Sequence, residues 1–160
     1  MKYLAIFMVL ILLASLVGVG WLYMTSTVTV EAARVVAMEA TTQEDYFRQL
    51  KEQIASGHVI GTQFSQTPLG DAADYQFYTY TVRLKNNTFL TADMVELQVT
   101  PMAGDVLQIG DDTARALAAH TTGDLQATIL TDVNMHSVRE LNITYYMWGV
   151  PFTLRTTYGN

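Results

Sequence analysis

The hydrophobic and polar positions divide the chain into two parts that meet near residue 25. Residues 3–24 read YLAIFMVLILLASLVGVGWLYM and carry no charged side chain. At about 1.5 Å per residue, a helix of this length covers roughly 30 Å, which is the thickness of a bilayer's hydrocarbon core. The pattern therefore predicts a membrane-spanning helix that delivers the rest of the chain onto or across a membrane.

Two interpretations of this segment stay open, a retained anchor and a cleaved secretory signal. Both interpretations require a basic residue at the start, and Lys2 supplies it. The apolar stretch is, however, longer than in most secretory signals. Trp21 and Tyr23 stand at its far end, where aromatic rings favour the headgroup boundary. We therefore favour an anchor at residues 1–24. Because no basic residue follows Lys2 before Arg34, the positive-inside rule predicts a cytoplasmic N-terminus and an outward-facing domain.

Beyond the anchor, apolar and polar positions alternate with the period of two that is typical of half-buried strands. The clearest case is residues 75–85, in which Tyr78, Tyr80, Val82 and Leu84 share one face. Further strands are expected at residues 59–65, 95–99, 105–109, 125–131, 138–148 and 152–158. Residues 25–40 contribute one or two strand-like pieces, with a continuation of the membrane helix as the competing interpretation. Residues 112–120 could form a short helical turn around Leu117.

One segment has helical spacing instead. Thr41 and Glu44 have the spacing of a capping box, which predicts a helix near residues 42–56. Phe47, Leu50 and Ile54 form its apolar stripe, and Gly57 is placed to end it.

Together these elements predict a mainly β fold behind an N-terminal membrane helix. We expect an antiparallel β-sandwich, immunoglobulin-like in architecture, with one α-helix. Residues 41–160 would form the β-rich domain, and residues 25–40 a juxtamembrane strand segment. The alternative is an α+β fold in which the helix packs on one antiparallel sheet.

Composition narrows the classes of partner. All fifteen acidic residues and eight of the nine basic residues lie beyond residue 24, which gives that part a net charge of −7. This charge disfavours nucleic acid and anionic lipid surfaces as partners, because binding to either needs a basic surface, and we expect no nucleic-acid partner. The absence of cysteine excludes disulfides, iron–sulfur clusters and thiolate zinc sites. An outward-facing domain without disulfides is typical of a bacterial cell envelope.

The sequence gives only weak evidence for a catalytic site or a metal-binding site. Asp105, Asp111 and Asp112 flank a short apolar run, and we interpret them as turn residues, not as calcium ligands. The three histidines lack the short spacings of a zinc site. A hydrolase of envelope polymers, with Asp105, Asp111 and Glu140 as its acids, is the least favoured option. We expect no enzymatic activity, no metal and no cofactor.

The aromatic side chains near the C-terminus are the best candidates for a binding surface. Alternation places Tyr145 and Met147 on one face of their strand, and Tyr146 and Trp148 on the other. If the second face is exposed, the candidate binding surface comprises Tyr146, Trp148, Phe152 and Tyr158. The alternative is that the helix covers this face, or that the rings pair across strands.

These observations favour a single-pass, membrane-anchored extracytoplasmic domain that acts through binding or assembly. We expect an accessory or structural component of a bacterial cell-envelope complex, with other membrane or envelope proteins as partners. A carbohydrate- or peptidoglycan-binding module is the alternative. Ala14 and Gly18 form a small-xxx-small pair, which leaves a homo-oligomer open as an option.

Overall fold

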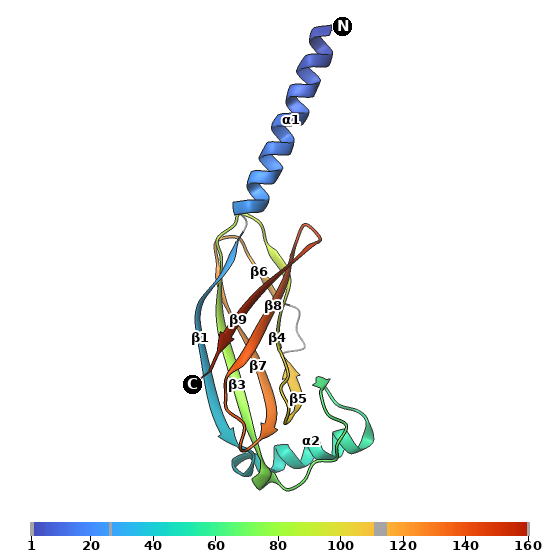
Figure 1. Cartoon of the computed structure of the whole chain (residues 1–160), viewed down its shortest axis with the longest axis vertical. Helices are drawn as coiled ribbons and strands as arrows, with labels where there is room; N and C mark the ends of the chain where they lie inside the picture. Colours follow the sequence, from blue (N-terminus) through green and yellow to red (C-terminus); the bar gives the residue numbers. More distant parts are fainter. Residues whose placement is uncertain (1, 26, 111–114, 160) are drawn as a thin grey trace.

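The computed structural model describes residues 2–25, 27–110 and 115–159. The first element, α1 (Lys2–Thr25), projects from one end of a two-layered β domain (Figure 1). Its segment Tyr3–Trp21 is long and apolar enough to cross a membrane, and none of it is buried against the rest of the chain. The predicted apolar helix is therefore present and separate from the hydrophobic core.

The domain consists of two antiparallel sheets, as predicted for a β-sandwich. The five-stranded sheet has the order β1 (Val28–Glu39), β3 (Tyr75–Asn86), β7 (Thr122–Asp132), β5 (Asp105–Gly110), β2 (Thr62–Gln63). The four-stranded sheet has the order β6 (Arg115–Leu117), β4 (Ala92–Val99), β8 (Arg139–Met147), β9 (Val150–Tyr158). The alternative of one open sheet covered by a helix is not what the described residues form.

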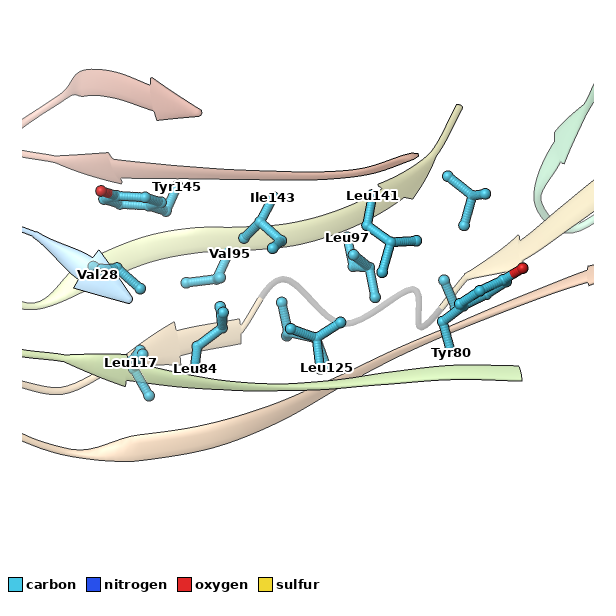
Figure 2. Packing of buried hydrophobic residues seen from close by; sticks show 14 of the residues in the cluster. Val28, Tyr80, Leu84, Val95, Leu97, Leu117, Leu125, Leu141, Ile143 and Tyr145 are labelled. Atoms are coloured by element: carbon cyan, nitrogen blue, oxygen red, sulfur yellow. The ribbon is translucent and has the colours of Figure 1, made fainter. Parts of the chain in front are cut away.

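The main core lies between the two sheets and follows from their alternating sequences. Tyr80 and Leu84 of β3 extend from one layer, and Leu97 and Ile143 of β4 and β8 extend from the other (Figure 2). Each inward position of β4 and β8 is buried, whereas the outward neighbours are exposed in β4 and mostly half-buried in β8. Burial of apolar surface between the two sheets is the main force that holds them together.

Strand β1 is one continuous edge strand of the five-stranded sheet. It pairs with β3 from Val28 to Glu39, with a bulge between Val30 and Ala32. The segment expected as one or two juxtamembrane pieces is therefore part of the sandwich itself. Only residues 26 and 27 separate it from α1.

The helix α2 (Glu44–Ser56) covers the outer face of the five-stranded sheet at the end far from α1 (Figure 1). Phe47 and Leu50 are buried there in a second core cluster with Phe77 and Leu130. The predicted stripe is thus confirmed as a packing surface. In addition, the rings of Phe47 and Tyr75 are in contact, with their centroids 5.5 Å apart.

The two ends of α2 differ in how well they were predicted. The capping-box prediction is wrong, because a 3₁₀ turn, η1 (Ala40–Gln43), precedes the helix and Thr41 Oγ1 donates to the Glu39 carboxylate instead. Gly57 ends the helix as predicted, with φ of 72°. Its N–H donates to Ile54 O, and His58 N–H donates to Gln53 O, which together make a Schellman motif.

Two expected elements are different in the structure. The strand expected at residues 59–65 is reduced to β2 and two hydrogen bonds from Phe64 and Ser65 to Val106 O. The helical turn expected around Leu117 is wrong, because β6 pairs with β4 there. A further 3₁₀ turn, η2 (Ala72–Asp74), leads into β3. Residues 111 and 112, expected as turn aspartates, lie outside the described residues.

Candidate functional site

The β8–β9 hairpin carries the predicted aromatic residues, and its turn has an unusual backbone. Met147 pairs with Val150, so Trp148 and Gly149 alone form the turn. Their φ angles are 51° and 75°, and positive φ at both positions is the signature of a type I′ hairpin turn. The Trp148 side chain is 72% exposed.

The four predicted surface residues are separated, because Trp148 lies in the turn and the cross-strand register divides the other three between two faces. Tyr145 lies opposite Phe152, and their rings stack with centroids 5.4 Å apart. Phe152 and Tyr158 therefore face the core, where both are half-buried against the main cluster. Tyr146 is half-buried on the outer face. The predicted opposition of Tyr145 to Tyr146 is confirmed, but the four residues do not form one surface.

The outer face of the four-stranded sheet lies opposite to the one that α2 covers, because α2 packs on the other sheet. Around Tyr146 this face is mostly polar, with exposed side chains at Glu96, Gln98 and Thr153. Met94 is also exposed there, with φ of 50°. The alternative in which the helix covers Tyr146 is wrong for this geometric reason.

A hollow of about 660 Å³ adjoins this face at the edge of β4. Glu96, Gln98 and Tyr146 line one side of it, and Gln108 and Gln126 line the other. Its walls thus combine an aromatic ring with several hydrogen-bonding groups. Such a combination is typical of sites for polar ligands with an apolar face, such as sugars.

The floor of the hollow is held by Gln108 of β5. Its side-chain carbonyl accepts from Val99 N–H at 2.8 Å, and its amide donates to Leu97 O at 3.0 Å. One buried side chain thereby supplies β4 with the hydrogen bonds that a neighbouring strand would otherwise make. This bridge joins the two sheets next to the hollow.

A buried ion pair closes the end of the sandwich that is far from α1. Arg139 donates from Nε and Nη2 to the two carboxylate oxygens of Asp105, at 3.0 and 2.7 Å, and both side chains are fully buried. Arg139 Nη1 also donates to the carbonyls of His136 and Val138. Bidentate geometry with further partners is what makes a buried charge pair tolerable.

Tyr80 lies beside this pair, and its hydroxyl donates to the carbonyl of Ser137. Burial of the ring raises the pKa of Tyr80 well above the usual value for a tyrosine. The network was not predicted from the sequence, although a signal existed. Arg139 stands in register with Leu141 and Ile143, so a charged residue occupies the inward face of a strand.

These contacts bear on the acidic residues considered for catalysis and metal binding. Asp105 is committed to Arg139, so its carboxylate is not available to a substrate. Glu140 lies on the opposite, exposed face of β8 and is 4.0 Å from Arg155. Among the described residues, no three histidine, aspartate or glutamate side chains gather into a metal-binding group.

Comparison with known proteins identified no family. No protein-family model matches the chain, and no curated protein matches it. Among solved structures, it is similar to the FixG-related protein from Vibrio parahaemolyticus, at 11% identity and a TM-score of 0.36, over 80% of this chain and 94% of that one. It is also similar to the cupredoxin domain of amoB from Nitrosocaldus yellowstonii, at 11% identity and a TM-score of 0.37, over 84% and 88%. Likenesses this distant say nothing of function.

Proposed function

We propose that this protein is a single-pass, membrane-anchored extracytoplasmic β-sandwich that acts by binding other envelope components. The observation that carries the proposal is the unburied apolar helix α1, which continues into strand β1 after only two residues. An apolar helix exposed in this way is unfavourable in water and favourable in a bilayer. A domain held so close to the bilayer meets neighbouring membrane and envelope proteins before distant soluble ligands.

The outer face of the four-stranded sheet is the binding surface that we assign to this function. It presents Tyr146 beside the exposed Met94, within a polar surround of Glu96, Gln98 and Thr153. Many transient protein interfaces have this composition, with aromatic and methionine side chains at the centre and polar side chains around them. The proposed role is that of an accessory or structural component of a bacterial cell-envelope complex.

Site-specific photocrosslinking in native membranes tests the assembly role. A photoreactive residue at Thr153, on this face, should give a discrete crosslinked partner. The matched control is Val36, which is exposed on the outer face of the other sheet and should give none. Equal crosslinking at both positions, or none at either, would count against this surface.

The hollow beside Tyr146 supports a second candidate function, binding of a carbohydrate such as a peptidoglycan fragment. Sugars stack on aromatic rings and need several hydrogen-bonding partners, and the exposed side chains of Gln98 and Gln126 supply such groups near Tyr146. Titration of the full chain in lipid nanodiscs with soluble peptidoglycan fragments should give saturable binding. Tyr146→Leu should abolish it and Val36→Ala should leave it unchanged; no binding to the unaltered protein would remove this candidate.

A further inference from the structure

The end of the sandwich nearest to α1 carries exposed aromatic side chains on a surface without charge. Three segments make up this surface, which we call the membrane-proximal rim: residues 87–91, 118–121 and 148–149. Figure 1 shows the β8–β9 turn, which includes residues 148–149, at the same end of the domain as the base of α1. Phe89 and Trp148 project from two of the segments and are 54% and 72% exposed.

The rim is attached directly to the chain that leaves the helix. Asn87 N–H donates to Thr27 O at 3.2 Å, and its side-chain amide donates to Thr29 Oγ1 at 2.9 Å. On the hairpin side, Tyr145 and Val28 are buried in the same core cluster. The start of β1 is thus tied to the rim by hydrogen bonds from Asn87 and to the hairpin by packing.

The rim loops are also ordered from within by a fully buried side chain. The Asn86 amide donates to the carbonyls of Leu90, Leu117 and Ala118, and its carbonyl accepts from Thr88. The two loops on either side of Asn86 therefore hold each other in place. Phe89 is presented outward from a rigid loop, so its exposure is built into the fold.

The backbone at Trp148 indicates that this residue serves a contact outside the chain. Positions with positive φ in a two-residue turn strongly favour asparagine, aspartate and glycine, because a Cβ is strained there. A tryptophan with φ of 51° accepts this strain without burying its ring in the core. Strained residues persist where they have a function, and an exposed tryptophan suits an interface between apolar and aqueous phases.

Charge distinguishes the rim from the rest of this acidic domain. The continuous segments 86–92, 116–123 and 141–154, which contain the rim, include no aspartate, glutamate, lysine or arginine. At the opposite end, Glu39 ends β1 and Glu44, Asp45 and Glu52 lie on α2, together with the basic Arg48 and Lys51, so that end is strongly charged. Negative charge is repelled by anionic lipid headgroups, and the rim has none.

We propose that the rim docks on the bilayer that α1 spans, with Phe89 and Trp148 inserted into its headgroup layer. The inference rests on the proposed function, in that α1 must be a retained anchor. The distances agree: from Trp21, at the end of the apolar span, to Thr25 the helix rises by about 6 Å, close to the thickness of one headgroup layer. Tryptophan and phenylalanine are the side chains that favour this layer.

Fluorescence quenching by lipids tests the docking in a defined system. The full chain with Trp21→Phe leaves Trp148 as its single tryptophan, and it is reconstituted into vesicles of phosphatidylcholine and phosphatidylglycerol. Lipids brominated near the headgroup should quench Trp148 several-fold more than a control tryptophan. The control carries Trp21→Phe, Trp148→Phe and Met102→Trp, which puts the reporter at an exposed position of the distal β4–β5 turn.

The outcomes separate this inference from the membrane anchorage. If the protein floats with the vesicles but Trp148 is quenched no more than Trp at position 102, the docking is wrong while the anchor stands. In that case the exposed tryptophan fits a protein partner better. If the protein does not float, the anchorage itself fails. Phe89→Ser, added to the Trp148 reporter, should lower the quenching without changing the melting temperature, and unchanged quenching would also contradict the docking.

Discussion

At the scale of single residues, the strongest interactions of this domain involve side chains whose types alone would place them on the surface. Arg139 and Asp105 are fully buried against each other, and Asn86 is fully buried among three carbonyls. In each case every charge or amide group is matched by a partner, as burial requires. Such residues fix one arrangement of the loops, because any other arrangement would leave a buried polar group unsatisfied.

The ion pair leads to a prediction about stability. Asp105→Asn should lower the free energy of unfolding by about 3–5 kcal/mol, because it leaves the Arg139 charge buried without a counter-charge. The double variant Asp105→Leu/Arg139→Met should lose much less, since no charge remains to be desolvated. Urea denaturation followed by circular dichroism of the full chain in micelles measures both. A double variant less stable than the single one would contradict this account.

Tyr80 leads to a prediction about alkaline pH. Burial raises its pKa in the folded protein above that of a tyrosine in the unfolded chain, which is about 10. Above pH 10 the unfolded state therefore loses a proton that the folded state keeps, so stability is present below pH 10 and falls as the pH rises further. Tyr80→Phe should make the decline between pH 10 and 12 shallower. An equal decline in both proteins would show that Tyr80 ionises freely in the fold.

At the scale of elements, the sequence of a strand or helix determines which of its faces is buried. Neighbouring segments of the chain determine where one of its ends lies. The alternation in β3 and β8 predicted their buried faces correctly, down to the opposition of Tyr145 and Tyr146. The start of α2 was predicted wrongly, because a 3₁₀ turn from the end of β1 takes the place of the capping box. Local rules held at the centres of these elements and at Gly57, which ends α2 as predicted, but they failed at the start of α2.

The C-terminus of α2 allows a test of one such local rule. Gly57→Ala should lower the free energy of unfolding by about 1 kcal/mol, because Gly57 has φ of 72° and a Cβ there is strained even though nothing lies within 4 Å of it. The matched control is Gly110→Ala, where a Cβ also meets nothing but φ is not in the left-handed region. Thermal unfolding should distinguish the two. An equal loss in both variants would argue against backbone strain as the cause.

At the scale of the whole molecule, the two ends of the sandwich differ in the side chains that they carry. One end joins α1 and carries the uncharged rim, whereas the other carries the buried ion pair, the acidic end of β1 and the charged helix α2. In the proposed docking, the charged end would lie in water and the uncharged end at the lipid. The outer face of the four-stranded sheet, which we propose as the binding surface, would then stand roughly along the membrane normal, accessible to neighbours in the same membrane.

The predicted orientation across the membrane is tested by cysteine labelling, because the natural chain has no cysteine. A single Thr153→Cys on the exposed face of β9 should react with a membrane-impermeant maleimide in intact bacterial cells with an accessible outer surface. Phe89→Cys in the rim should react more slowly if the rim docks on lipid. Labelling at position 153 that appears only after the cells are permeabilised would reverse the proposed topology.

The sequence by itself determined the apolar helix, the mainly β domain and the inward face of most strands. These properties follow from local spacing: a long uncharged run, and alternation with a period of two. They need no knowledge of which strands are neighbours. The same information correctly opposed Tyr146 to Tyr145, but it placed Trp148 on the strand beside Tyr146, whereas Trp148 lies in the hairpin turn.

Only the tertiary structure decided which residues meet. Phe152 faces the core because the cross-strand register places it opposite Tyr145. Arg139 pairs with Asp105, which lies 34 positions away in the sequence. The placement of Phe89 and Trp148 at the same end of the sandwich likewise depends on the pairing of β3 with β1 and of β8 with β4 and β9. Register and loop proximity are set by contacts distant in the chain, and a local pattern carries no record of them.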